Sequence, residues 1–413
     1  MTQVAPPVSD AAPPGLVDAP QTLGGAVRRF VDGVRSGDLG SLPIIFGLLV
    51  IVVIFQAQND NFLTSGNFVN LVVQMAGVTT IAIGVVFVLL LGEIDLSVGF
   101  VSGVAGVTVA KILLPGGFGL PSLLAIGLAL LVGAGIGVLQ GTIIAKIGVP
   151  SFVVTLAGLL AWQGVVLLVI GEGGTVVIQD GLVIDIANSF LSDRLGWLLA
   201  AASAALYGIS KAVGILGRRR AGLPTGSLLF TVLKVVAFAA AVFLVVAVAN
   251  RDRGFPTAGV IVATLLVFWT YVATRTTFGR HVYAVGGNAE AARRAGISVD
   301  RIRITVFAIS GLMAGLGGVI LASRLYSVDT GAGGGTLLLD AIAAAVIGGT
   351  SLFGGRGQVK SALLGALIIA SVANGMGLLG LSAGTQFLVT GLILLAAVTV
   401  DSISRRRLAA TGR

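Results

Sequence analysis

The feature that most limits what this chain can fold into is a succession of long apolar runs, from Leu42 almost to the C-terminus. Each run is about twenty residues long, the length at which an α-helix crosses a hydrocarbon core of ~30 Å. Only 10% of the 413 residues are charged, whereas an average soluble domain has roughly 25%. The sequence therefore predicts an all-α, polytopic helical membrane protein with about 10–12 transmembrane segments.

Twelve apolar segments can be recognised along the chain. They span residues 41–57, 68–91, 96–113, 121–145, 150–170, 195–212, 228–249, 257–274, 303–323, 337–353, 359–379 and 385–402. Segment 337–353 is short and rich in glycine, and the break at 92–95 is too short for an ordinary loop. We therefore expect some of the segments to be broken or re-entrant.

The remaining sequence consists of tails and loops. Residues 1–40 are predicted to form a cytoplasmic tail with a short amphipathic helix in GAVRRFVDGVRS, and residues 403–413 a basic cytoplasmic tail. A frayed lead-in to the first membrane segment is the open alternative for this helix. The order of residues at the start does not match a signal peptide, so we expect no cleavage. The transmembrane domain, 41–402, contains an external loop at 171–194 and a cytoplasmic loop at 275–302.

Basic residues are distributed unevenly between the two predicted sides. With both termini in the cytoplasm, 20 of the 26 lysine and arginine residues fall in inside segments and 5 in outside segments. Cytoplasmic loops of membrane proteins carry such an excess. We therefore predict a multi-pass protein with both termini cytoplasmic, and the net charge of +9 follows from this bias without a nucleic-acid partner.

The residue types present exclude several kinds of chemistry. The chain has no cysteine and a single histidine, His281, which excludes Cys-based zinc sites, an HExxH site and a Ser-His-Asp triad. No GxxxxGK[ST] phosphate-binding loop occurs. We expect no catalytic residue, no metal site and no cofactor.

Glycine is unusually frequent, at 61 residues. Small residues spaced four apart let transmembrane helices approach each other closely. The sets with this spacing include Gly99/Gly103, Gly133/Gly137/Gly141 and Gly311/Gly315. We interpret them as helix-packing positions.

The longest inside loop contains a short helix with signals at both ends. Asn288 is a good N-cap, Glu290 lies in the first turn, and Arg293 and Arg294 lie in the last turn, where the helix dipole favours cations. Gly296 is placed to end the helix in a left-handed conformation. Because so short a helix is marginal in water, it needs something to pack against. A cytoplasmic partner and the surface of its own protein are both open alternatives.

Two acidic residues inside the predicted membrane suggest helix starts. Asp95 can accept the backbone N–H of Ser97 or Val98 if Leu96 is the first helical residue, and Asp340 can do the same for the residues that follow it. Irregular backbone at this depth survives only inside protein or beside water. Glu93 is not explained by such a cap.

Three separated blocks of this chain resemble the permease subunits of bacterial ABC sugar importers, in the branch that handles ribose and xylose. They are GEIDLSVG at 92–99, FGRHVYAVGGNAEAARRAGI at 278–297 and LDAIAAAVIGGTSLFGGRGQV at 339–359, followed by ANGMGLLG at 373–380. The resemblance covers roughly 41–402. Glu93 and the basic stretch ILGRRRAGLP at 215–224 make the chain most similar to the D-xylose-type permeases.

The resemblance implies a role and a set of partners. The chain would be a non-catalytic transport subunit in the bacterial inner membrane, forming a homodimer with a cytoplasmic ABC ATPase below and a periplasmic or extracellular sugar-binding protein above. The loop around 288–296 would be the coupling helix that contacts the ATPase. The residues carried over to coupling are Gly286, Gly287, Asn288, Glu290, Arg293, Arg294 and Gly296.

A neutral sugar needs weak hydrogen-bonding groups along its route rather than fixed charges. Gln163, Asn374 and Gln386 are the neutral amides that we consider first as pathway residues, with hydrogen bonding between helices as the alternative. The other intramembrane polar candidates are Glu93, Asp95, Ser97 and Asp340.

Two other functions compete with this interpretation. An ion-coupled secondary transporter would use Glu93, Asp95 or Asp340 to carry a proton or to bind sodium. An intramembrane enzyme would need a carboxylate pair such as Glu93 and Asp95, but side chains two apart on a helix diverge.

Overall fold

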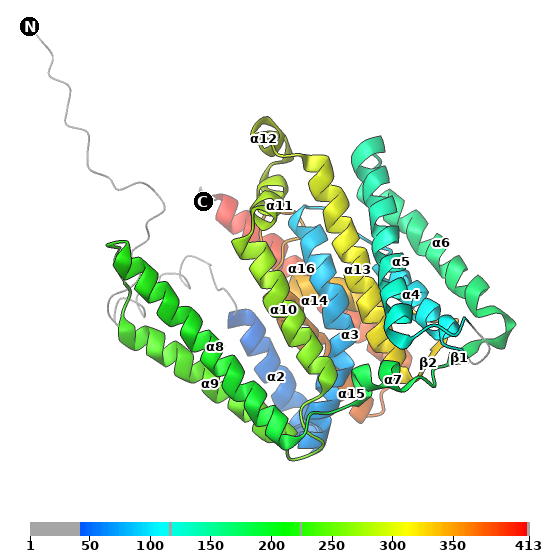
Figure 1. Cartoon of the computed structure of the whole chain (residues 1–413), viewed down its shortest axis with the longest axis horizontal. Coiled ribbons are helices and arrows are strands. Elements are labelled where there is room, and N and C mark those ends of the chain that lie inside the picture. The colour runs from blue at the N-terminus through cyan, green and yellow to red at the C-terminus, as the bar shows by residue number, and fades with distance from the viewer. Residues whose placement is uncertain (1–41, 115–117, 224, 411–413) are drawn as a thin grey trace, which may run out of the picture. The chain divides into compact units, whose positions relative to one another are not determined.

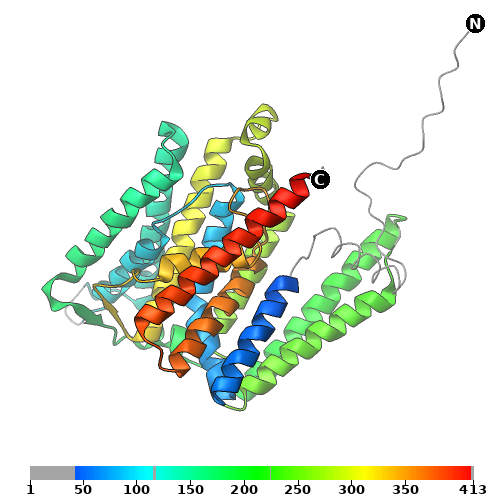
Figure 2. The same cartoon turned by 180° about the vertical axis from the view of Figure 1, so that it is seen from behind.

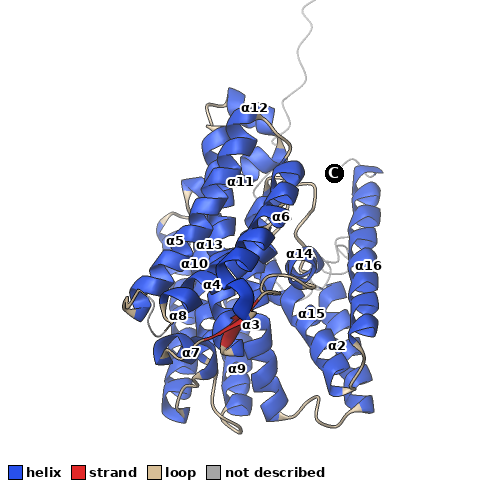
Figure 3. Cartoon of the chain, turned by 90° about the vertical axis from the view of Figure 1, so that its right-hand side faces the viewer, coloured by secondary structure: helices blue, strands red, loops and turns tan. Residues whose placement is uncertain are grey.

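The computed structural model describes residues 42–114, 118–223 and 225–410. The amphipathic helix predicted within 1–40 and the last three residues of the predicted basic tail lie outside the described residues. Among the described residues, the only strands are two short ones, which are drawn in red in Figure 3. The chain is otherwise built from helices, so the prediction of an all-α membrane protein is confirmed.

Every predicted apolar segment forms a helix. The twelve helices are α2 (Leu42–Gln58), α3 (Ser65–Leu90), α4 (Val98–Ile112), α5 (Ser122–Thr142), α6 (Ser151–Ile170), α8 (Asp193–Arg220), α9 (Leu228–Ala249), α10 (Thr257–Arg275), α13 (Val299–Leu325), α14 (Leu337–Ile347), α15 (Lys360–Leu378) and α16 (Ala383–Ala410). Eight of the described helices are long and apolar enough to cross a membrane, by length and composition.

Four of the twelve helices are not among these eight, and the two shortest of them, α4 and α14, cannot span a bilayer. Helix α4 has 15 residues and α14 has 11, which correspond to lengths of about 22 and 16 Å at ~1.5 Å per residue. A non-helical segment, 91–97, precedes α4, and residues 348–359 follow α14 without a helix. These interruptions confirm that some of the membrane segments are broken.

The remaining elements lie in the connections. They are a π-helical turn at Ile143–Ile147, a 3-10 turn at Gly171–Gly173, β1 (Thr175–Val177), α7 (Gly181–Asn188), α11 (Thr277–Gly287), α12 (Ala289–Arg294) and β2 (Ser327–Asp329). Strands β1 and β2 pair antiparallel, with Val176 opposite Val328. The pairing joins the predicted external loop to the segment that follows α13.

Two compact units make up the fold. The first contains Trp197–Ala247, which includes most of α8 and α9. These two helices pack through aromatic side chains: Trp197 stacks on Phe243 at 5.8 Å between ring centroids, and Tyr207 lies 4.5 Å from Phe238. Many of their large apolar side chains are exposed in the chain by itself, as expected for helices that face lipid.

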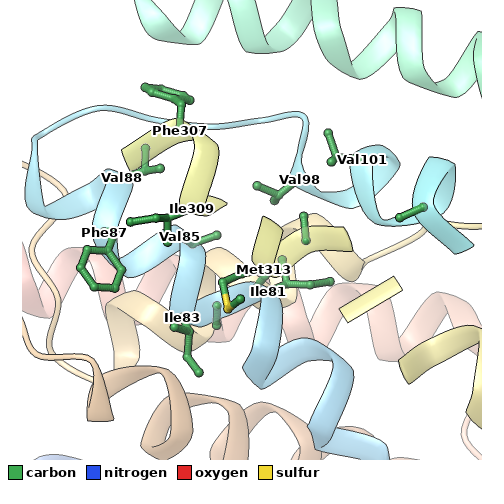
Figure 4. Close-up of a cluster of buried hydrophobic side chains, with 14 of the residues drawn as sticks. Ile81, Ile83, Val85, Phe87, Val88, Val98, Val101, Phe307, Ile309 and Met313 are labelled. Atoms are coloured by element: carbon green, nitrogen blue, oxygen red, sulfur yellow. The ribbon is translucent and has the colours of Figure 1, made fainter. Parts of the chain in front are cut away.

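The core of the second unit is formed by α3 and α13. Helix α13 packs against α5, α3 and α4 (Figure 1). Buried side chains such as Phe87 and Val85 of α3 and Met313 of α13 belong to one apolar cluster, which Figure 4 displays. Helix α15 packs against α14, α3 and α2 on the other side of α3, as Figure 2 displays from behind.

Glycines allow the closest helix contacts, as their spacing predicted. A Cβ at Gly133 of α5 would stand 2.5 Å from the carbonyl oxygen of Gly311 on α13, and a Cβ at Gly137 would overlap the carbonyl oxygen of Phe307. Glycine at these positions therefore brings the two backbones into contact, since any side chain would separate them.

Polar contacts place the connections of the second unit at two opposite ends. At one end Lys146 pairs with Asp300 at 3.1 Å, near α12. At the other end Ser122 donates to Asp180 at 2.6 Å, near β1 and β2. We call these the α12 end and the β1–β2 end, and Figure 1 displays both.

Candidate functional site

The helix predicted in the inside loop forms as α12, with both predicted end signals in place. Asn288 is its N-cap, and the side-chain oxygen accepts the backbone N–H of Ala291 at 2.9 Å. Gly296 has φ of 84°, a left-handed conformation that favours glycine. Because its neighbour Ile297 donates to the carbonyl of Ala292 at 3.0 Å, the helix end is closed by a hydrogen bond.

The charged residues of α12 pair with one another on the surface. Glu290 lies 3.0 Å from Arg293 and 3.3 Å from Arg294, and all three side chains are more than half exposed. Such exposed pairs contribute little to stability. Within α12 only Ala292 is buried, so the helix presents its polar face outward.

Helix α11 was not predicted. Its N-cap is Thr276, whose hydroxyl accepts the N–H of Gly279 at 3.2 Å, and its buried side chains include Val282 and Val285. The spacing of these valines and the threonine N-cap are sequence signals from which helix α11 could have been predicted. Helix α11 ends at Gly287, and only Asn288 separates it from α12. The packing of α11 against the protein therefore positions α12.

The two coupling glycines predicted at this join lie in different surroundings. Gly286 is packed against the backbone of Leu90, where an added Cβ would overlap the carbonyl oxygen. Gly287 is exposed, with nothing within 4 Å of an added Cβ. Gly286 therefore faces into its own protein.

Glu93 has a partner that the sequence did not reveal. Its carboxylate lies 3.0 Å from the guanidinium of Arg303, near the start of α13. The pair ties the segment between α3 and α4 to α13 at the α12 end. Glu93 is thus held by an opposite charge, and it makes no pair with Asp95.

Asp95 is buried within a network of hydroxyl and amide groups. One carboxylate oxygen accepts the backbone N–H of Ser97 at 2.9 Å, and the other accepts the hydroxyl of Ser310 at 2.9 Å. The hydroxyl oxygen of Ser97 lies 2.7 Å from Asp95 and 3.0 Å from the side-chain oxygen of Gln140. The network joins the start of α4 to α5 and α13.

The expected capping roles are therefore correct in part for Asp95 and wrong for Asp340. Helix α4 begins at Val98 rather than Leu96, yet Asp95 does accept the predicted N–H of Ser97. Helix α14 begins at Leu337, so Asp340 lies inside its first turn and accepts the hydroxyl of Thr336 at 2.7 Å. Because the turn before Asp340 is already helical, the N–H groups of residues 341–343 bond to carbonyl groups within α14 and need no cap.

The three neutral amides proposed for a pathway lie on different helices and have different partners. Asn374 of α15 exchanges hydrogen bonds with Asn67 at 2.8 and 2.9 Å and donates to Gln74 at 3.4 Å. Gln386 donates to the carbonyl of Leu381 at 3.0 Å. Gln163 is half-buried on α6, and its side chain makes no hydrogen bond within the described residues. Only Asn374 belongs to a polar cluster.

A polar cavity of about 190 Å³ lies next to that cluster, towards the β1–β2 end. Its polar lining residues are Asn70, Gln74, Asn188, Arg253 and Arg324. Arg253 donates to Asn70 at 2.9 Å and pairs with Asp252 at 3.0 Å. The cavity is smaller than the ~300–1,000 Å³ typical of drug-sized ligands. The sequence interpretation missed it because its residues come from four separate segments.

This arrangement fits transport better than catalysis. Glu93 and Asp95 have separate partners, Arg303 and the serine hydroxyls, so they do not face each other as an acid and a base. The polar groups lie near the two ends of the central helices, and an exposed capped helix lies at one of these ends.

Comparison with known proteins gives consistent results. The chain is 39% identical to the xylose transport system permease protein of Escherichia coli (strain K12) over 376 residues, which cover 91% of this chain and 95% of that protein. It is 36% identical to the xylose transport system permease protein of Haemophilus influenzae, over 91% of this chain and 99% of that protein. It is 33% identical to the ribose import permease protein of E. coli (strain K12), over 87% of this chain and 92% of that protein.

No solved structure matches the chain. The family model described as the permease component of the branched-chain amino acid transport system matches residues 67–398. This match includes α3 through most of α16, and therefore the Asp95 network, α12 and the polar cavity. The chain belongs to this family of transport-system permease components.

Proposed function

We propose that this chain is the membrane-spanning permease subunit of an ATP-binding-cassette importer that translocates a monosaccharide, xylose or a related pentose or hexose. The observation that carries the proposal is the similarity along nearly the whole chain to permeases named for xylose and ribose. The subunit itself catalyses no reaction, and a separate ATPase supplies the energy.

The amide groups of the polar cavity support a sugar as the substrate. The cavity is lined by Asn70, Gln74 and Asn188 together with two arginines, and none of its lining residues is a carboxylate. The amides can hydrogen-bond to sugar hydroxyls, and the charge of Arg253 is already paired with Asp252 at 3.0 Å. Of the predicted pathway residues, we assign Asn374 to the sugar's route, together with its hydrogen-bond partners Asn67 and Gln74.

The exposed helix α12 supports a cytoplasmic partner. Its cap at Asn288 and its end at Gly296 hold a rigid element outside the apolar helices, and Glu290, Arg293 and Arg294 are available to a groove in an ATPase. In this arrangement the chain lies in the inner membrane of the cell. The α12 end and both termini face the cytoplasm, and loop 171–194 is external. A second copy of the chain and a sugar-binding protein complete the transporter.

The test is reconstitution of the purified transporter into liposomes. The chain is co-purified with its ATPase and its sugar-binding protein, and radiolabelled xylose and ribose uptake is measured with and without ATP. We expect uptake that requires ATP, the ATPase and the loaded binding protein. Uptake driven by an ion gradient with no ATPase present would overturn the proposal in favour of a secondary transporter.

A variant in α12 makes the test specific to this chain. Glu290→Lys places a long cation where it is repelled by the neighbouring arginines and by the positive helix N-terminus. We expect it to reach the membrane in normal amount but to lose the co-purified ATPase and ATP-driven uptake. Wild-type uptake by this variant would contradict the assignment of α12.

A further inference from the structure

Three segments that are distant in the sequence meet backbone to backbone beside α12. They are the end of α3 with Gly92, the end of α11 with Gly286, and the loop at Gly354 and Gly355. The carbonyl oxygen of Leu90 accepts the N–H of Gly355 at 2.9 Å. We call Gly92, Gly286, Gly354 and Gly355, together with Leu90, the glycine junction.

The absence of side chains makes this junction possible. A Cβ on Gly286 would overlap the carbonyl oxygen of Leu90, and one on Gly354 would stand 2.8 Å from the oxygen of Gly286 and 2.9 Å from the nitrogen of Gly92. Gly92, Gly354 and Gly355 also have φ of 75°, 83° and 72°, which favour glycine. Gly286 lies in a helix, so at this position the close contact alone excludes other residues.

A hydrogen bond joins α11 to the same loop. The hydroxyl of Tyr283 donates to the carbonyl oxygen of Gly357 at 2.9 Å. Burial raises the pKa of the Tyr283 phenol above its ordinary value, so the group remains protonated and can donate. Helix α11 thus contacts the loop at two points, by close packing at Gly286 and by the hydrogen bond from Tyr283.

Two of the three segments lead to a polar group of the membrane core, and the third leads to α12. Segment 91–97, which follows Leu90, contains Asp95, whose network includes Ser310 of α13. The loop at 354–357 leads into α15, which carries Asn374. The third segment, α11, leads through Gly287 and Asn288 directly into α12.

We propose that the glycine junction transmits displacement of α12 to the two interrupted segments of the membrane core. This inference rests on the proposed function, and it deepens that function by assigning the step between ATPase docking and opening of the sugar route. A force on α12 acts on α11, and the contacts at Leu90 and Gly357 carry segment 91–97 and the loop before α15 with it. Gly286 is then a positioning residue for transport and does not contact the ATPase.

The experiment compares Gly286→Ala with Gly127→Ala in the complete transporter reconstituted in liposomes. Gly127 is a helical glycine of α5 with nothing within 4 Å of an added Cβ. ATPase co-purification, ATP hydrolysis stimulated by the sugar-loaded binding protein, and sugar uptake are measured together. For Gly286→Ala we expect normal ATPase co-purification and a fall in sugar taken up per ATP hydrolysed of about 5- to 150-fold, the usual span of coupling between two sites. Gly127→Ala keeps the wild-type ratio.

If Gly286→Ala does not accumulate in the membrane, a second variant tests the role of the glycine junction. Tyr283→Phe removes one hydroxyl and keeps the ring, so the chain still folds, and the same ratio should fall at least about fivefold. Wild-type ratios in Tyr283→Phe and in any folded Gly286→Ala protein would overturn the inference. Loss of ATPase co-purification in Gly286→Ala would also overturn it, because Gly286 would then be part of the docking surface. Failure of the proposed function itself would be recognised separately, in the wild-type chain, as uptake without any ATPase.

Discussion

Glu93 and Arg303 form an ion pair of 3.0 Å that joins the interrupted segment after α3 to the start of α13. The pair is mostly covered, with 14% of the Glu93 side chain and 29% of the Arg303 side chain exposed. A charge in such a position needs its partner, because an unpaired charge loses water without compensation. The pair therefore holds segment 91–97 in a fixed position against the start of α13.

This pair predicts a specific pattern of stability. Arg303→Met should lower the free energy of unfolding by roughly 1.5–3 kcal/mol, the range for hydrogen bonds to charged groups, because Glu93 remains mostly buried without its partner. Glu93→Gln combined with Arg303→Met should lose less than the sum of the two single changes. Thermal unfolding of the detergent-solubilised single and double variants measures the difference. Strictly additive losses would mean that the two side chains do not interact.

The Asp95 network predicts that shape matters more than charge at this position. Asp95→Ala should leave the hydroxyl of Ser310 and the N–H of Ser97 without acceptors, at a cost of roughly 1–3 kcal/mol for each buried group. We expect a reduced folding yield in the membrane. Normal yield with lost transport would instead indicate a direct role of Asp95 in the pathway.

Asp95→Asn is the matched control for this prediction. The amide keeps one oxygen acceptor, and its NH₂ group can donate to a serine hydroxyl that reorients. We expect near-normal yield and ATP-driven sugar uptake. If the neutral variant folded but lost uptake under an ion gradient, the carboxylate would be acting as an ion carrier.

The cap of α12 predicts how ATPase binding depends on one side chain. Asn288→Ala removes the acceptor for the N–H of Ala291, which costs about 0.5–2 kcal/mol at a helix start. A six-residue helix has little else to hold it, so we expect less co-purified ATPase. Asn288→Asp retains an acceptor and should restore binding. Equal recovery of the ATPase with both variants would show that the cap does not hold the docking surface.

The contact of α5 with α13 predicts opposite results for two nearby glycines. Gly137→Ala places a methyl group against the carbonyl of Phe307, and overpacking of this kind costs typically 1–3 kcal/mol. Gly135 has nothing within 4 Å of an added Cβ, so Gly135→Ala should be neutral or slightly stabilising. Unfolding of the two variants, measured side by side in detergent, tests the difference, and equal midpoints would refute it.

The elements that the sequence predicted best are those determined by local chemistry. Each apolar segment forms a helix, because a segment this apolar lies in the membrane, where a helix satisfies its own backbone hydrogen bonds. The ends of α12 were also predicted, since Asn288 and Gly296 act on their immediate neighbours. The glycine spacing at Gly133 and Gly311 predicted a close contact, although not which helices would make it.

The elements that were missed depend on partners distant in the sequence. Glu93 was unexplained because Arg303 lies on a helix that begins about 200 residues later. The polar cavity and the glycine junction likewise arise only when separate segments meet. Asp340 was assigned to the wrong position because Thr336 extends α14 by one turn before it, a shift within the usual error of predicted helix ends.

The contrast between α3 and α6 has a consequence for how the chain tolerates substitution. In its most apolar window 83% of α3 is buried inside the protein, against 28% for α6. A saturation-mutagenesis map should therefore show α3 intolerant of volume changes around its whole circumference. The map of α6 should show tolerance recurring every ~3.6 residues, with any apolar residue accepted on the outer face. Variation between related chains should accumulate on that outer face first.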